Sequence, residues 1–307
     1  MTTKPSGSRS AGKRRTRAAA VSVLVAVSLV LIKVVAGSMT NSLSLLASAV
    51  DSLTDIFASA VNFVAIRAAS RPADREHVYG HGKAEGLAGL FQAVIIGLSG
   101  AFLGYKSVMR LVKPEAIEAE VVGISVMAVS MLASYLLVRH LRKVAKETGS
   151  LALEADSLHY STDVLANGGV LLLLAVVAVT GMPILDPMAS LGISAYIVWA
   201  AIGVLRTSID HLMDRAMPDH LIDTVARMAA EHAHVLGVHD IKSRMAGSET
   251  FIEMHLEMDG GMSLRDSHDA AVEVLRRVEE ELPNSRVFVH VDPVDPVDSV
   301  SPVDPDR

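Results

Sequence analysis

Apolar residues dominate the first two thirds of the chain, where they form long runs separated by short polar stretches. A helix that crosses the apolar core of a bilayer needs about 20 mostly apolar residues. Six segments meet this length, at residues 17–38, 43–67, 84–109, 119–139, 153–180 and 184–206. The first run is too long for the apolar part of a secretory signal peptide. The pattern therefore predicts six transmembrane helices within residues 17–207, after a basic tail at residues 1–16.

After residue 207 the pattern becomes that of a small water-exposed domain. "MPDHLIDTVARMAAEHAHV" and "SLRDSHDAAVEVLRRVEEEL" predict helices, whereas "VHDIKSRMAG", "TFIEMHLEMD" and "SRVFVHVDP" predict strands. The second strand alternates apolar and polar residues, which is typical of a half-buried sheet. The order α-β-β-α-β predicts a two-layer α+β domain over residues 208–292. The tail at 293–307 repeats Asp-Pro-Val and is predicted to be disordered.

Composition and charge support this division. Half of the 307 residues are hydrophobic and the mean hydropathy is +0.39. Lys and Arg gather in the N-terminal tail and in the loops after the second and fourth segments, so the positive-inside bias places both termini in the cytoplasm. Cysteine is absent, which excludes disulfides and thiolate metal ligands. A metal site would have to use His, Asp, Glu or backbone oxygen.

Ionisable residues recur inside two of the apolar segments. Asp51 and Asp55 lie four residues apart in the second segment, and His159 and Asp163 have the same spacing in the fifth. Residues at i and i+4 lie on one helix face. Two facing helices could therefore present three carboxylates and one imidazole to a common point, a ligand set that suits Zn²⁺ and also admits Cd²⁺, Co²⁺, Fe²⁺ or Mn²⁺.

Other interpretations of this quartet stay open. Lys33 in the first segment could pair with one carboxylate, although it cannot satisfy three. An intramembrane aspartyl hydrolase would use paired aspartates on different helices, whereas Asp51 and Asp55 share one. A metal sensor with a membrane anchor would need no charge within the membrane. No H-E-x-x-H sequence occurs, which argues against a metalloprotease of that type.

Further candidate ligands lie outside the apolar segments. Asp74, His77 and His81 fall within eight residues of one loop, so a turn could gather them on one metal ion. In the last domain His239 and His255 lie on predicted strands, and the end of the third strand carries a histidine and a carboxylate on one face, His290 and Asp292. His268 lies on the second helix of that domain. The alternative is a dimerisation module with incidental histidines.

Some polar residues receive no metal-binding role. Asn62 is expected to make an interhelical hydrogen bond. Asp156 is expected either to support the ligands or to lie at the membrane surface. Three further histidines match no site and are expected to be surface residues or weak metal ligands near the membrane: His211, His232 and His234.

The motifs together resemble those of the cation diffusion facilitator family. They are "SLLASAVDSLTD", "HVYGHGKAE", "ADSLHYSTD", "LMDRAMPD" and "GVHDIKSR…IEMHLEM…VFVHVDP", and they occur in the family's order. The resemblance as a whole covers about residues 17 to 292. The resemblance implies a proton-driven exporter of divalent metal, most similar to members that carry zinc, and not an enzyme. It also implies iron, manganese and cadmium as alternative substrates.

The resemblance implies further features of architecture and partners. The last domain is expected to have a metallochaperone-like fold, with a two-metal site at a homodimer interface formed by His239, His255, His268, His290 and Asp292. Lys83 and Asp214 are expected to form a salt bridge where the two domains join. We expect a multi-pass protein of a bacterial inner membrane, with lipid, protons and Zn²⁺ but no nucleic acid as partners.

Overall fold

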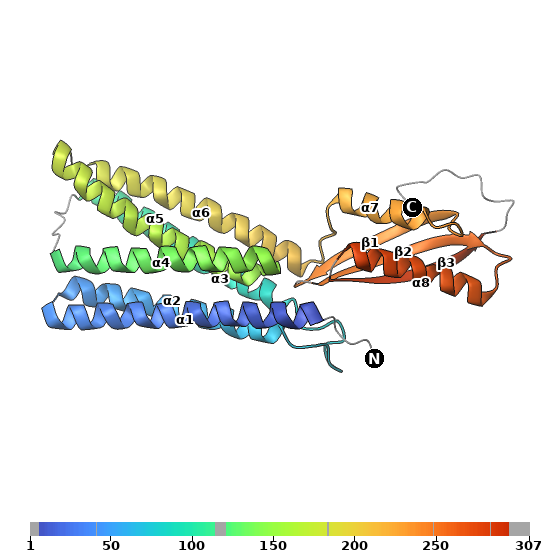
Figure 1. Ribbon diagram of the computed structural model, residues 1–307. Coiled ribbons are helices and arrows are strands. Elements are labelled where there is room, and N and C mark those ends of the chain that lie inside the picture. Colours follow the sequence, from blue (N-terminus) through green and yellow to red (C-terminus); the bar gives the residue numbers. More distant parts are fainter. Residues whose placement is uncertain are drawn as a thin grey trace. The chain divides into compact units, whose positions relative to one another are not determined.

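The computed structural model describes residues 6–40, 42–113, 121–182, 184–247, 249–282 and 284–294. The chain divides into two compact units, Met1–Ile209 and Asp210–Arg307 (Figure 1). The predicted disordered tail lies outside the described residues from position 295 onward.

The first unit consists of long helices, one for each predicted span. They are α1 (Ser6–Thr40), α2 (Leu43–Ala69), α3 (Ala84–Val112), α4 (Val121–Thr148), α5 (Leu151–Thr180) and α6 (Leu185–Leu212), the last of which ends just past the unit boundary. Five of them, all except α5, are long and apolar enough within the described residues to cross a membrane. The helical transmembrane domain predicted from the sequence is thereby confirmed.

The helices extend beyond the apolar segments that predicted them. α1 begins at Ser6, inside the predicted tail, and α4 continues to Thr148. The α4 extension is rich in Lys, Arg, Ala and Glu, which have high helix propensity, whereas the α1 extension combines Lys and Arg with several Ser and Gly residues. Hydropathy marks only the part of a helix that suits lipid, so it underestimates the length of the helix.

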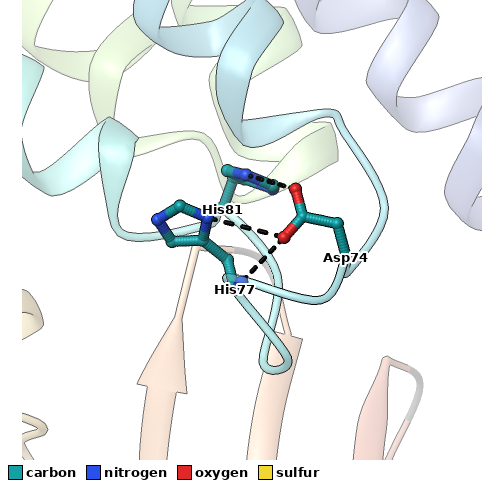
Figure 2. Close-up of side chains that lie close together, drawn as sticks. All are labelled: Asp74, His77 and His81. Atoms are coloured by element: carbon teal, nitrogen blue, oxygen red, sulfur yellow. Dashed lines mark hydrogen bonds and ion pairs between the residues drawn. The ribbon is translucent and has the colours of Figure 1, made fainter.

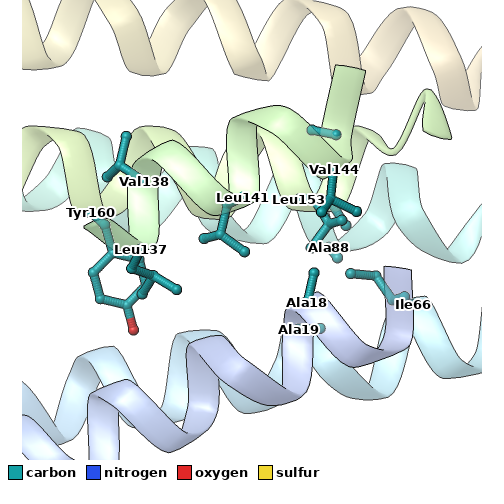
Figure 3. Packing of buried hydrophobic residues seen from close by; sticks show 12 residues of the cluster. Ala18, Ala19, Ile66, Ala88, Leu137, Val138, Leu141, Val144, Leu153 and Tyr160 are labelled. Atoms are coloured by element: carbon teal, nitrogen blue, oxygen red, sulfur yellow. The ribbon is translucent and has the colours of Figure 1, made fainter. Parts of the chain in front are cut away.

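Small side chains let the helices of the first unit approach closely. Ala18 and Ala19 on α1 and Ala88 on α3 are buried in a cluster with larger apolar residues (Figure 3). Close packing of small residues is the usual means of associating helices in lipid, where the hydrophobic effect between helices is weak. Other large side chains point outward: Leu98 on α3 is 66% exposed and Trp199 on α6 is 71% exposed.

A buried ion pair connects three of these helices. Arg15 Nη1 on α1 donates to Glu85 Oε1 on α3 at 2.7 Å. The second oxygen of Glu85 accepts from Ser150 Oγ at 2.6 Å, and Ser150 caps the N-terminus of α5. The side chains of Arg15 and Glu85 are only 7% and 1% exposed. The pair therefore fixes the start of α5 relative to α1 and α3.

The second unit contains the predicted α-β-β-α-β order. Its elements are α7 (Asp219–Ala230), β1 (Gly237–Ala246), β2 (Glu249–Asp259), α8 (Leu264–Glu281) and β3 (Ser285–Val294). The strands form one sheet in the order β1-β2-β3, with β1 antiparallel and β3 parallel to β2. α8 provides the crossover that a parallel pair requires.

The alternation seen in the sequence determines the two faces of this sheet. Ile252, Met254, Leu256 and Met258 on β2 are at most 1% exposed and pack in one core with apolar residues of α7 and α8. The residues between them point to the opposite face, where His255 lies. The helices thus cover one face of the sheet and leave the other available for polar chemistry.

We predict that Arg15→Ala lowers the free energy of unfolding of the protein by about 3–5 kcal/mol, because it leaves the buried Glu85 without its counter-charge. The matched control is Arg14→Ala, which removes the neighbouring, exposed pair with Glu147 and should change stability by at most about 1 kcal/mol. Chemical unfolding of both variants in detergent measures the difference. Equal effects would contradict the structural role assigned to Glu85.

Candidate metal-binding sites

The first candidate site lies between α2 and α5 and is called the intramembrane site. His159 Nε2 is 3.1 Å from Asp55 Oδ1 and 3.9 Å from Asp163 Oδ2. One ligand atom from each of these residues lies within 4.8 Å of the others, a spacing at which one metal ion could be bound. Asp51, the fourth predicted ligand, is on α2, but its side chain lies outside the described residues.

The intramembrane site is only partly enclosed. The side chain of His159 is 6% exposed, whereas those of Asp55 and Asp163 are 25% and 37% exposed. A cation can therefore approach the carboxylates from one side while the imidazole remains fixed in the protein. Lys33 does not neutralise this group through a salt bridge with a described residue; its Nζ donates to Ser52 Oγ at 2.6 Å.

A fully buried polar layer lies next to this site and is formed by residues of α1, α2 and α5. Ser59 Oγ on α2 is within hydrogen-bond distance of Ser22 Oγ at 3.1 Å and of Tyr160 Oη at 2.9 Å. Asp156 and Asn62 are both 0% exposed, and neither side chain has a hydrogen-bond partner among the described residues.

Two residues of the buried polar layer were considered in the sequence analysis. Asp156 is not exposed at the protein surface, since its side chain is completely buried. Asn62 is buried beside Asp156 of α5, but no hydrogen bond of normal geometry joins it to a described residue. The i, i+3 spacing of Asp156 and His159 indicated a shared helix face, but only the packing of α1 and α2 against α5 shows how completely that face is covered.

The second candidate site is in the loop between α2 and α3 and is called the loop site. Figure 2 shows Asp74, His77 and His81 turned toward one another, as predicted from their spacing. Asp74 Oδ1 is 3.5 Å from His77 Nδ1, and Asp74 Oδ2 is 3.3 Å from His81 Nε2. Gly80 adopts a φ of 87°, which a glycine tolerates without strain and which turns the chain between the two histidines.

The backbone of the loop prepares Asp74 for cation binding. Its Oδ1 accepts from the N–H groups of His77 at 2.7 Å and Glu76 at 3.0 Å. These bonds, that of His77 first, hold the pKa of the Asp74 carboxyl below its usual value. The carboxylate consequently stays ionised and is a competent ligand over the whole physiological pH range.

The third candidate site lies on the open face of the sheet and is called the sheet site. His239, His255 and His290 are paired in register across β1, β2 and β3 and form a row. Asp292 touches all of them: its Oδ2 is 3.3 Å from His239 Nε2 and 2.8 Å from His255 Nδ1, and its Oδ1 is 3.1 Å from His290 Nε2. The carboxylate therefore occupies the position of a bridging ligand.

A residue that the sequence analysis missed also lies at the sheet site. Asp240 Oδ2 is 3.8 Å from His255 Nε2. In a regular strand Asp240 would point to the face opposite His239, but the strand pairing is irregular between His239 and Lys242, and Asp240 has a φ of 48°. The hydrogen bond from Lys242 holds the pKa of the Asp240 carboxyl below its usual value. A bulge of this kind leaves no clear signal in the sequence.

The other predicted site residues have different surroundings. His268 is exposed on α8 and makes no ion pair with a described residue of the sheet site. Lys83 belongs to the first unit and Asp214 to the second, so their salt bridge stays a prediction.

The three histidines without an assigned role differ in their surroundings. His234 is exposed, as expected, and His232 pairs with Glu273 at 3.1 Å. The expectation of a surface position was wrong for His211, which is 9% exposed and accepts a hydrogen bond from Gly247 N–H at 2.9 Å.

Comparisons with known proteins cover nearly the whole chain. Residues 19–213 match the family described as "Cation efflux transmembrane domain", and residues 217–294 match "Cation efflux protein, cytoplasmic domain". The cation-efflux pump FieF of Cronobacter sakazakii is 39% identical over 282 residues, which is 92% of this chain and 94% of the relative. FieF of Pectobacterium atrosepticum is 38% identical over 279 residues, or 91% and 93% of the two chains.

We predict that Asp292→Asn lowers the number of zinc ions bound per chain at a fixed free zinc concentration, because Asp292 is the carboxylate that, among the described residues, contacts all three histidines of the sheet site. Glu253→Gln is the control, since Glu253 is exposed on the same face of β2 outside the cluster. Equilibrium dialysis of the full-length protein followed by elemental analysis gives the count. Equal zinc content in the two variants would contradict the assignment.

For the loop site we predict weaker zinc binding in Asp74→Asn and unchanged binding in Glu76→Gln. Asparagine keeps an oxygen that accepts the N–H groups of the loop but removes the charge, so the variant separates metal binding from loop folding. Competition with a zinc chelator should show about a tenfold or larger loss of affinity for Asp74→Asn. The same loss of affinity in Glu76→Gln would show that the overall negative charge of the loop, and not ligation by Asp74, determines zinc binding.

Proposed function

Since the chain belongs to the cation diffusion facilitator family of membrane cation efflux transporters and is not an enzyme, we propose that it exports Zn²⁺ in exchange for protons. The observation that carries this proposal is the intramembrane site, where Asp55, His159 and Asp163 converge between α2 and α5. An imidazole with carboxylates is a typical zinc ligand set, and Asp51 is proposed as the fourth ligand.

The ligand chemistry favours zinc among the divalent cations. Imidazole suits Zn²⁺ better than Mg²⁺ or Ca²⁺, and affinities of nitrogen and oxygen sites rise from Mn²⁺ through Fe²⁺ toward Zn²⁺. Cd²⁺, Fe²⁺ and Mn²⁺ are the competing substrates, because the same groups also bind them. The names of the relatives specify cation efflux and no particular metal, so the choice rests on the donor atoms.

Proton exchange follows from the same donor atoms. Histidine must be neutral and carboxylates ionised to hold a metal ion, so protons and metal compete for one site. An ordinary imidazole takes up a proton near pH 6.5, within the range that cells maintain. If the site opens in turn to each side of the membrane, protons that enter on one side displace the metal, which then leaves on the other.

The mixed composition of the intramembrane site separates this proposal from a hydrolase. An aspartyl hydrolase needs two carboxylates that share a water molecule. Here the carboxylates of Asp55 and Asp163 both lie close to one imidazole nitrogen, His159 Nε2, a ligand that an aspartyl dyad does not need. The sensor alternative is also disfavoured, since an anchor would not retain ionisable groups between α2 and α5.

The second unit is proposed to act as a zinc-binding dimerisation domain. The sheet site provides more ligands than one tetrahedral ion uses, which fits a pair of ions bridged by Asp292. His268 is proposed to join a site completed in the homodimer. Both termini are proposed to lie in the cytoplasm of a bacterium with the protein in the inner membrane, because Lys and Arg gather near the start of α1 and the end of α4.

We predict that uphill zinc accumulation in proteoliposomes requires a pH gradient. With an acidic lumen, zinc accumulates inside vesicles that contain the parent protein, and a protonophore together with a K⁺/H⁺ exchanger abolishes the accumulation. Asp163→Asn should lower the initial rate at least about tenfold, because it removes a ligand. A zinc indicator in the lumen measures the rate.

Glu154→Gln is the matched control, because Glu154 is exposed on the first turn of the same helix. It should transport at the parental rate. Uphill accumulation that persists without any gradient would overturn the proton coupling. A parental rate for Asp163→Asn would overturn the transport site, and faster movement of Cd²⁺, Fe²⁺ or Mn²⁺ than of Zn²⁺ would replace the proposed substrate.

A further inference from the structure

A groove of about 510 Å³ lies between α1 and α4 in the first unit. Arg14 and Arg17 line it near the start of α1 and Val21 and Leu24 line it farther along that helix, while His140 and Val144 of α4 line its other side. The groove does not include any residue of the three metal-binding sites. A pocket with this division of charge suits a ligand that has an anionic head and an apolar tail.

The charges at the basic end are available for a ligand. Arg17 is exposed and makes no ion pair or hydrogen bond with a described residue, and the same holds for His140, which lies farther along the groove on α4. Arg14 pairs with Glu147 on α4, but this pair is exposed and uses only one nitrogen of the guanidinium group. A guanidinium group has further N–H donors in a planar fork that matches phosphate oxygens.

The apolar end continues as a track along both helices. On α1 the exposed residues Leu24 and Leu31 follow Arg17 at seven-residue intervals, so they lie on nearly the same side of the helix. On α4 the residues at i−4 and i−8 from His140 are Leu136 and Leu132, which are 56% and 59% exposed. An extended acyl chain lying along this face would meet apolar side chains for more than two helical turns.

We propose that this groove is a binding site for an anionic phospholipid, with the phosphate held by Arg17 and Arg14 and an acyl chain along the exposed leucines of α1 and α4. Basic pockets between transmembrane helices near the headgroup layer suit anionic lipid heads. A nucleotide or free phosphate would use the basic end but leave the leucine track unoccupied. A second copy of this chain, docked by a two-fold axis, would bring the unpaired Arg17 residues toward each other.

The test uses the full-length protein in neutral detergent, with bound lipid counted by native mass spectrometry as phosphatidylglycerol is added. We expect Arg17→Gln to bind phosphatidylglycerol about tenfold more weakly, which corresponds to the loss of one charge-assisted hydrogen bond. Lys13→Gln is the matched control, because Lys13 is exposed on α1 one turn away and outside the lining. Its affinity should change less than about threefold.

Four further measurements complete the test: binding of two other ligands, the oligomeric state without lipid, and circular dichroism. Phosphatidylcholine and glycerol phosphate should each bind at least about tenfold more weakly than phosphatidylglycerol, since one has no net negative head and the other has no tail. Equal binding by Arg17→Gln and the parent, or an equal loss in Lys13→Gln, overturns the proposal. So does tight binding of glycerol phosphate, or a change of oligomeric state in Arg17→Gln without lipid. Circular dichroism of both variants confirms that each remains folded.

Discussion

The first unit depends on how it compensates the charges that are buried between its helices. Removing an ion from water costs several kcal/mol even inside a protein, and the cost is recovered only through close counter-charges and hydrogen bonds. At Glu85 this compensation is complete, since Arg15 and Ser150 use both carboxylate oxygens. At the intramembrane site it is incomplete, because one imidazole lies against two carboxylates.

This difference distinguishes a structural ion pair from a site that can exchange its ligand. Glu85 is sealed from solvent, so it holds the start of α5 permanently in place. Asp55 and Asp163 remain partly exposed and share a single imidazole. A bound divalent cation would therefore supply positive charge that the neighbouring side chains do not provide. Ser150 links the two regions, since it both satisfies Glu85 and caps the helix that carries His159.

The sequence predicted the elements and the ligand clusters because both depend on short-range spacing. Six apolar runs gave six helices, and alternation on β2 identified the buried face. The i, i+3 and i, i+4 spacings brought Asp74 near His77 and His159 near Asp163. The contact between Asp55 and His159 could also be predicted, although the two residues are far apart in the sequence, because each is an ionisable residue in an otherwise apolar segment.

Features that depend on tertiary packing could not be predicted in this way. Glu85 follows a polar loop and looks like an ordinary first-turn carboxylate, yet Arg15, seventy residues earlier, makes its burial possible. His211 resembles a surface residue until Gly247 is folded against it. Asp240 reaches the sheet site only because the strand is irregular there. Each of these depends on contacts that a single segment does not contain.

The row of histidines across the sheet has a consequence for folding. A slip of β3 by one position would turn His290 and Asp292 into the apolar layer and bring Val289 and Val291 out to water. Only the native register of β3 brings these side chains together. A metal ion bound to the cluster would therefore stabilise the native register relative to registers shifted by one residue. Bound metal would thus favour correct pairing of β2 and β3 while the protein folds, in addition to any role in the folded protein.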